Sequence, residues 1–255
     1  MKKYIIIIII LSLSLFLMNA CVGENQNSQQ TITIAEQYGL AYAPVQLIKE
    51  LQLLEKSKPE LKVEWKQLSN TTSIRESMLA GEVDIAFMAI PPFLIARDKG
   101  MEWKIISGLS ESPLGLMTNR IDINSLADFK AEDKIALPQP GSIQHILLTM
   151  AAQRDFNNTD KFDNQLLTMS HPDAMNSLLA GREVAAHFAS APYLFLESRE
   201  TGIKEILSGR EAFGGDFTFI IGVSTNSFYQ QQTENYEIFY KALLESVKFI
   251  DQNPA

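Results

Sequence analysis

The chain has 255 residues, with 30 acidic side chains against 22 lysines and arginines and a formal net charge of −8. This acidic balance argues against nucleic acid as a partner, because nucleic-acid binding depends on clustered basic side chains. The apolar fraction of 46% and the charged fraction of 20% exclude a largely disordered chain. A single cysteine excludes an intrachain disulfide or a cysteine-based zinc site. We expect no bound metal and no cofactor.

The N-terminus has the pattern of an export signal. Lys2 and Lys3 precede an apolar run of about 15 residues, which suits a signal peptide and is short for a membrane span. The only cysteine, Cys21, follows Ala20 just after this run, which resembles a bacterial lipoprotein signal. We predict a signal peptide over 1–20, followed over 21–30 by the lipidated Cys21 and a flexible tether. The alternative is an ordinary signal or short anchor helix, with Cys21 there by chance.

Short apolar strands alternate with helical patterns in the first half of the chain. Pro44 and the Pro91-Pro92 pair stand where a first helical turn tolerates proline. Leucine and isoleucine over 47–54 fall on one helical stripe, and a helix with its N-cap among 71–73 ends at Gly81. The strands predicted here are 31–35, 61–66, 83–88 and 103–108.

The second half repeats this plan, which predicts an α/β fold with largely parallel sheets. A helix follows Gly141-Ser142, a second covers 172–180, and a long amphipathic helix near the C-terminus carries apolar residues over 239–250. Segments 79–94 and 179–194 are also similar, which suggests two related lobes, although generic strand–helix grammar is the alternative. The strands predicted in this half are 134–137, 165–169, 184–189 and 218–223.

Five segments in this order resemble the extracytoplasmic solute-binding proteins of ABC importers, of the nitrate/sulfonate/taurine type. They are 80–87, 90–93, 125–129 with the following strand 134–136, 140–142 and 186–189. The resemblance implies a two-lobed periplasmic-binding-protein type II fold, with two crossover strands near 112–118 and 216–222. The lobes are then 31–112 plus 218–255, and 113–217. Proteins of this type usually continue with further helices, so the sequence is expected to be a fragment or a truncated product.

Ligands of open α/β sheets bind beyond the carboxyl ends of the strands, beside helix N-termini that attract anions. Gly141 lets the backbone approach a ligand closely, and the Ser142 hydroxyl can donate. Each of three candidates also has a structural alternative to ligand binding. Ser142 could be a helix cap and His187 a core histidine. Asp216 could cap a turn instead of binding a ligand ammonium. The ligand-binding residues that we expect are Tyr38, Tyr42, Met88, Ala89, Gly141, Ser142, Gln144, His187, Ser190 and Asp216.

The resemblance implies a non-catalytic, monomeric receptor outside the cytoplasm, anchored to the membrane through Cys21. It would capture a small anionic or heteroaromatic solute and deliver it to a permease and, through the permease, an ATPase subunit. A ligand-binding lobe for a membrane sensor is an alternative. An enzyme similar to the thiamine-pyrimidine synthase is another, but that enzyme uses a pyridoxal cofactor and a cysteine-rich motif. This chain has one cysteine and no HExxH, GxSxG or paired-carboxylate motif, so we expect no catalytic activity.

Overall fold

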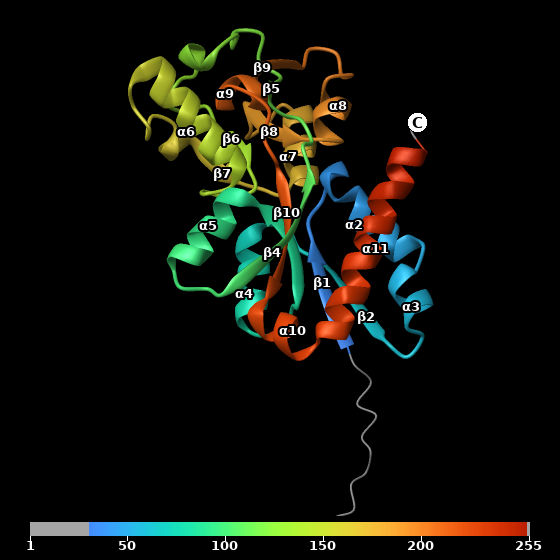
Figure 1. The fold of residues 1–255 in the computed structure, drawn as a ribbon. Helices are drawn as coiled ribbons and strands as arrows, with labels where there is room; N and C mark the ends of the chain where they lie inside the picture. The colour runs from blue at the N-terminus through green and yellow to red at the C-terminus, as the bar shows by residue number, and fades with distance from the viewer. Residues whose placement is uncertain (1–30, 254–255) are drawn as a thin grey trace, which may run out of the picture. The chain divides into compact units, whose positions relative to one another are not determined.

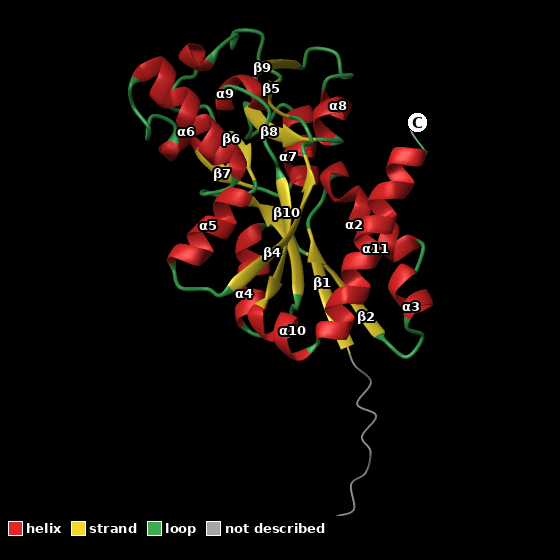
Figure 2. Ribbon diagram, viewed as in Figure 1, coloured by secondary structure: helices red, strands yellow, loops and turns green. Residues whose placement is uncertain are grey.

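Two five-stranded sheets lie within residues 31–253, the part of the chain that the computed structural model describes (Figures 1 and 2). The predicted signal peptide, the predicted lipidation site Cys21 and the predicted tether lie outside the described residues. The first sheet has the order β2-β1-β3-β10-β4, and the second has the order β7-β6-β8-β5-β9. The strands of the first sheet are β1 (Thr31–Glu36), β2 (Lys62–Gln67), β3 (Ile85–Ala89), β4 (Trp103–Ser110) and β10 (Ile220–Thr225). Those of the second are β5 (Leu114–Thr118), β6 (Ile135–Leu137), β7 (Leu166–Thr168), β8 (Ala186–Ser190) and β9 (Lys204–Ser208).

The two sheets have the same plan, with one reversed strand in the fourth position of each. In the first sheet β1 is parallel to β2 and β3, whereas β10 is antiparallel to β3 and β4. In the second β6 is parallel to β7 and β8, whereas β5 is antiparallel to β8 and β9. The prediction of largely parallel sheets is therefore incomplete: each crossing of the chain, at 111–113 and at 214–219, leads into the reversed strand of the other sheet. The exact boundaries of the two lobes stay a prediction.

Helices connect the strands and cover the sheets (Figure 1). The predicted 47–54 stripe is split into two helices at Gln52, because a left-handed residue, here at φ 52°, ends a right-handed helix. The helix predicted to begin among 71–73 is capped by Asn70, whose side chain accepts a hydrogen bond from the Ser73 amide. The helices are α2 (Ala43–Glu50), α3 (Leu53–Ser57), α4 (Thr71–Leu79), α5 (Ile90–Asp98), α6 (Ile143–Phe156), α7 (His171–Leu179), α8 (Tyr193–Glu197), α9 (Gly209–Phe213), α10 (Asn226–Gln231) and α11 (Thr233–Gln252).

The predicted similarity between 79–94 and 179–194 corresponds to one local unit built twice. Helix α4 and helix α7 end two residues before Gly81 and Gly181, which have positive φ angles of 72° and 62°. A positive φ is favourable for glycine and ends the helix at little cost. The chain then enters β3 or β8, which hold equivalent positions in the two sheets.

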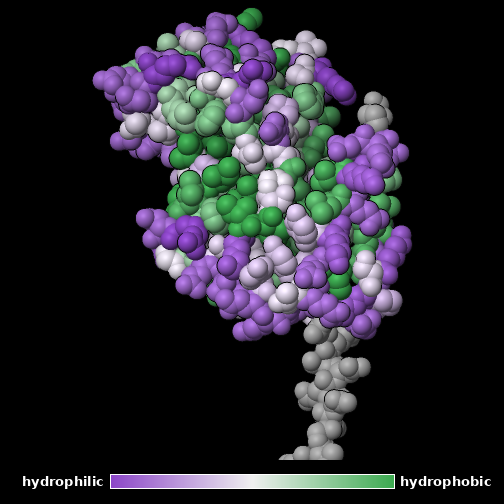
Figure 3. Space-filling view, viewed as in Figure 1, coloured by the Kyte–Doolittle hydropathy of each residue, from purple (hydrophilic) through white to green (hydrophobic). Residues whose placement is uncertain are grey.

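Apolar side chains fill the space between the sheets and their helices. In α11 the predicted stripe is buried in its first part, at Phe239 and Leu243, whereas Val247 and Ile250 are partly exposed. Hydrophobic atoms also reach the surface in the middle of the face shown in Figure 3, over β4, β10 and α5. Exposed apolar residues of α5 and β4 include Leu94 and Ile105. Within 31–253, none of the helices combines the length and apolar character that crossing a membrane requires.

Candidate functional site

A small cavity lies where the strand ends of the two sheets meet. It is reached by the carboxyl ends of β1, β3, β6 and β8 and by the first residues of α6 and α7, the place where α/β sheets bind ligands. Its volume of about 20 Å³ leaves room for about one water molecule. It is lined by Gln37, Tyr38, Tyr42, Thr71, Ala89, Pro92, Pro138, Ser142, Ile143, Gln144, His171, Ser190, Phe219 and Ile220.

Hydrogen bonds join the two sides of the cavity. The Leu40 amide donates to the Ala191 carbonyl at 2.9 Å, between the β1–α2 and β8–α8 connections. The Thr72 amide donates to the side-chain oxygen of Gln139 at 2.9 Å, between α4 and the β6–α6 connection. Gly39 permits this close approach, because a Cβ there would lie only 3.0 Å from the Ala191 carbonyl oxygen. The φ angle of Gly39, +130°, is also one that residues with a side chain rarely adopt. The cavity is therefore closed by direct contacts between its two walls.

The structure brings part of the predicted ligand-binding set together at this cavity. Ser142 caps α6, since its hydroxyl oxygen accepts from the His145 amide, and its own O–H stays available to donate. Its structural and ligand-binding roles are therefore compatible. Ligand binding by any of these side chains stays a prediction. The predicted residues that line the cavity are Tyr38, Tyr42, Ala89, Ser142, Gln144 and Ser190.

The remaining predicted residues lie elsewhere. Met88 is fully buried in β3 and packs in the core of the first sheet. Gly141 faces a neighbouring surface pocket, and its amide donates to His145 Nδ1 at 2.9 Å, so this N–H already has a partner. His187 is fully buried and contacts His171, which does line the cavity.

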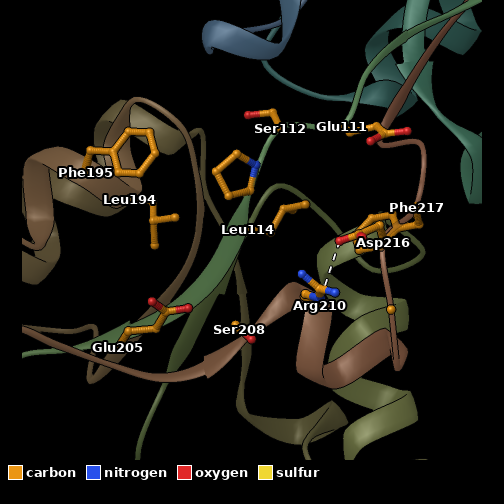
Figure 4. Close-up of a pocket in the computed structure, with 12 residues that line it drawn as sticks. Glu111, Ser112, Leu114, Leu194, Phe195, Glu205, Ser208, Arg210, Asp216 and Phe217 are labelled. Atoms are coloured by element: carbon orange, nitrogen blue, oxygen red, sulfur yellow. Dashed lines mark ion pairs between the residues drawn. The ribbon is translucent and has the colours of Figure 1, made fainter.

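Asp216 lines a separate, larger cavity of about 380 Å³ beside the two crossings (Figure 4). It forms an ion pair with Arg210, whose Nε lies 3.4 Å from Asp216 Oδ1. Both side chains are largely exposed, at 73% and 70%, so the pair is weak in water. Across this cavity Figure 4 shows Glu205 and Leu194. Asp216 is therefore not brought together with the residues at the strand ends.

Among the described residues that line the small cavity, none is lysine, arginine, aspartate or glutamate. Burial lowers the pKa of His171 well below its usual value, and the buried His187 lowers it further, so the imidazole is neutral. Just behind the wall, burial raises the pKa of Glu36 to about 7, and its Oε2 has no hydrogen-bond partner. Burial, with Glu36 nearby, also raises the pKa of Tyr42, which keeps its proton. The site is therefore uncharged or weakly negative.

Four buried side chains form a continuous hydrogen-bonded line that runs inward from the cavity. Gln144 Nε2 lies 3.3 Å from His171 Nε2, and His171 Nδ1 lies 2.8 Å from His187 Nε2. His187 Nδ1 then lies 2.5 Å from Glu197 Oε1. Burial raises the pKa of Glu197 to about 8 and lowers that of His187 to about 3. We call this set the histidine chain: Gln144, His171, His187 and Glu197.

Sequence reasoning missed His171, Glu197 and several lining residues. His171 is the first residue of α7, and this position after a predicted strand could have identified it by the rule that selected Ser142. Glu197 carries no comparable signal, since its role depends on the packing of α8 against β8. The lining residues outside the predicted ligand-binding set are Gln37, Thr71, Pro92, Pro138, Ile143, His171, Phe219 and Ile220.

A family model described as NMT1/THI5 like matches residues 57–255. An uncharacterised protein of Methanocaldococcus jannaschii is 27% identical over 143 residues, which cover 48% of this chain and 99% of that protein. The alkanesulfonate-binding protein of Xanthomonas axonopodis pv. citri, solved with MOPS, superposes with a TM-score of 0.72 at 18% identity. This match covers 87% of the chain and 74% of that protein.

The ligand-binding component of an ABC-type import system from Staphylococcus aureus, solved with zinc bound, gives a TM-score of 0.68 at 18% identity, covering 86% and 74%. These likenesses confirm the predicted periplasmic-binding-protein fold. In the described part of the present chain, no three His, Cys, Asp or Glu side chains are grouped so as to hold a metal ion.

Proposed function

We propose that this chain, which belongs to the NMT1/THI5-like family, is a solute-binding protein that captures a small molecule at the strand ends of its two sheets. The observation that carries the proposal is the cavity where strand ends and helix starts from both sheets meet. On this proposal the protein acts as a monomer outside the cytoplasm and hands its solute to the permease and ATPase subunits of an ABC importer. No step of chemistry on the solute is needed.

The lining favours an uncharged heteroaromatic solute over a simple anion. Tyr38, Tyr42 and Phe219 offer flat apolar surfaces, and the side-chain amides of Gln37 and Gln144 can each donate and accept. A simple anion would find no lysine or arginine among these lining residues and would depend on helix N-termini and hydroxyl groups. Micromolar affinity corresponds to about −8 kcal/mol, which stacking and a few hydrogen bonds can supply.

Solute entry requires the two walls to separate. Small-molecule sites usually enclose about 300–1,000 Å³, whereas this cavity measures about 20 Å³. The crossings at 111–113 and 214–219 are short and are the natural hinges for such a movement. The hydrogen bonds of Leu40 and Thr72 across the cavity would then break on opening.

The proposal is tested by a thermal-shift screen of pyrimidines, sulfonates, nitrate, bicarbonate and aromatic acids. A solute that binds only the folded state raises the Tm in a concentration-dependent way, and we expect one-to-one binding without conversion of the solute. Gln144→Ala should weaken that binding about 3- to 10-fold, because one hydrogen bond at the cavity is lost. Gln153→Ala, an exposed change on the same helix, is the matched control. Conversion of the solute by stoichiometric protein would contradict a receptor.

The lipid anchor is a separate part of the proposal, since Cys21 lies outside the described residues. We expect Cys21→Ser to move the protein from the membrane fraction to the soluble fraction, because each buried acyl CH₂ contributes about 0.8 kcal/mol to membrane binding. Cell fractionation with immunoblotting measures the change. Ser28→Ala, in the same tether, should leave the distribution unchanged. Wild type and Cys21→Ser in the same fraction would exclude lipidation at this residue.

A further inference from the structure

The atoms of the histidine chain define the direction of its hydrogen bonds. An amide nitrogen only donates, so His171 Nε2 accepts from Gln144 Nε2 and the proton of His171 lies on Nδ1. That proton is donated to His187 Nε2, which places the His187 proton on Nδ1, facing Glu197 Oε1. We call this arrangement of donors and acceptors the ionised order, because it ends on the ionised carboxylate of Glu197. It leaves the carbonyl oxygen of Gln144 free for the cavity.

In a second arrangement, the protonated order, donor and acceptor are exchanged in each of these hydrogen bonds and the histidine chain holds one more proton. A proton from solvent enters at His171 Nε2, which is at the cavity wall, and the Nδ1 proton of His171 passes to His187 Nε2. The Nδ1 proton of His187 then passes to Glu197 Oε1, so the carboxyl becomes neutral and donates back to His187 Nδ1. His171 Nε2 now donates, and Gln144 must turn its carbonyl oxygen toward it. The amide nitrogen of Gln144 is then the group that faces the cavity.

We propose that the histidine chain is a proton relay that determines whether Gln144 presents its carbonyl oxygen or its amide nitrogen to a solute in the cavity. The relay makes Glu197, His187 and His171 positioning residues for the solute. This consequence rests on the proposed function. A solute with an amino edge matches the ionised order, and a solute with a ring nitrogen or carbonyl edge matches the protonated order.

Burial makes the free energies of the two orders similar. All four side chains are buried, and Glu197 Oε2 has no hydrogen-bond partner, which disfavours the ionised carboxylate and raises its pKa to about 8. The short bond to His187 stabilises the carboxylate whenever the imidazole donates. Both histidines stay neutral in either order, in keeping with their lowered pKa values.

Of the described elements that pack around the histidine chain, α8 contributes a further titratable group. Tyr193 of α8 stacks on His171, with ring centroids 5.7 Å apart, and burial followed by the nearby Tyr38 raises the pKa of Tyr193, so it stays protonated. Strands β5 and β6 place Met117 and Ala136 beside His187 in register. On α6 the next residue after Gln144, His145, bonds instead to the Gly141 amide and Asp163.

The test needs no solute, because the proposal predicts the tautomer of each histidine. Long-range ¹H–¹⁵N spectra of the full chain between pH 6 and 9.5 report which ring nitrogen holds the proton. We expect His171 and His187 to change together from Nε2–H to Nδ1–H with one midpoint near pH 8. The side-chain NH₂ signal of Gln144 should move with the same midpoint. His145 is the internal control for the tautomer, since its Nδ1 accepts from the Gly141 amide and its neutral form therefore carries the proton on Nε2.

Glu197→Gln should fix one order, so that neither histidine nor Gln144 responds to pH in this range. Glu205→Gln, a change at an exposed glutamate of β9 whose pKa desolvation also raises, should leave the change intact. Fixed tautomers in the wild type, an imidazolium at either histidine above pH 6, or a switch that persists in Glu197→Gln would overturn the relay. A failed solute screen with the switch present overturns the proposed function alone, whereas solute binding with fixed tautomers overturns the relay alone.

Discussion

Replacing Phe239 with alanine is expected to lower the free energy of unfolding by about 3–5 kcal/mol. Phe239 is fully buried in α11, and its ring centroid lies 6.1 Å from that of Phe87 in β3. Because the protein interior is close-packed, the surrounding side chains cannot fill the space that the ring leaves. Urea unfolding followed by circular dichroism measures the loss.

Phe249→Ala provides the matched control on the same helix. Phe249 is 43% exposed, so its removal should cost less than about 1 kcal/mol. Equal losses in the two variants, or a loss below 1 kcal/mol for Phe239→Ala, would contradict the packing of α11 against the first sheet.

The elements that sequence reasoning predicts well are those with a local chemical signal. Pro44 lies in the first turn of α2, and Gly81 and Gly181 follow the ends of α4 and α7 with positive φ angles. Each signal acts within a few residues, so the sequence alone carries it. The predicted N-cap of α4 was wrong by at least one residue, because Asn70 precedes three residues with hydroxyl side chains that are equally good candidates.

The elements that were missed depend on tertiary pairing. Strand β9 (Lys204–Ser208) has only one buried residue, and it pairs with β5 across about 90 positions of sequence. The reversed directions of β5 and β10 likewise follow from the crossings and not from any property of these strands themselves. Local hydrophobic patterns carry no information about strand direction.

The candidate site was predictable in position and less so in composition. The rule that ligands bind beyond strand ends located Tyr38, Ala89, Ser142 and Ser190, each of which follows or ends a strand or begins a helix. The rule does not predict how deeply a side chain is buried or which residues it contacts. The bond from His187 to Glu197 therefore had no local signature, because it depends on α8 packing against β8.

Between pH 4.5 and about 8, the wild type is expected to lose stability relative to Glu197→Gln as the pH rises. Burial raises the pKa of Glu197 from 4.5 to about 8. In this interval the folded state holds the proton that the unfolded state has released, so unfolding is favoured by a rise in pH. The stabilising contribution is complete below pH 4.5 and is lost as the pH rises through 8. The difference in the free energy of unfolding between the two proteins should change by at most about 1.4 kcal/mol per pH unit.

The buried histidines have the opposite dependence and cancel in this comparison. Burial lowers the pKa of His187 from 6.5 to about 3, so its contribution is present above pH 6.5 and is lost as the pH falls. Both proteins keep this histidine, and urea unfolding at pH 5, 6, 7, 8 and 9 therefore isolates the carboxyl. Glu245→Gln, on the exposed side of α11, should follow the wild type throughout. A difference between wild type and Glu197→Gln that is constant with pH would show that Glu197 is ionised throughout the range, and the folded state would then hold only the order in which Gln144 offers its carbonyl oxygen.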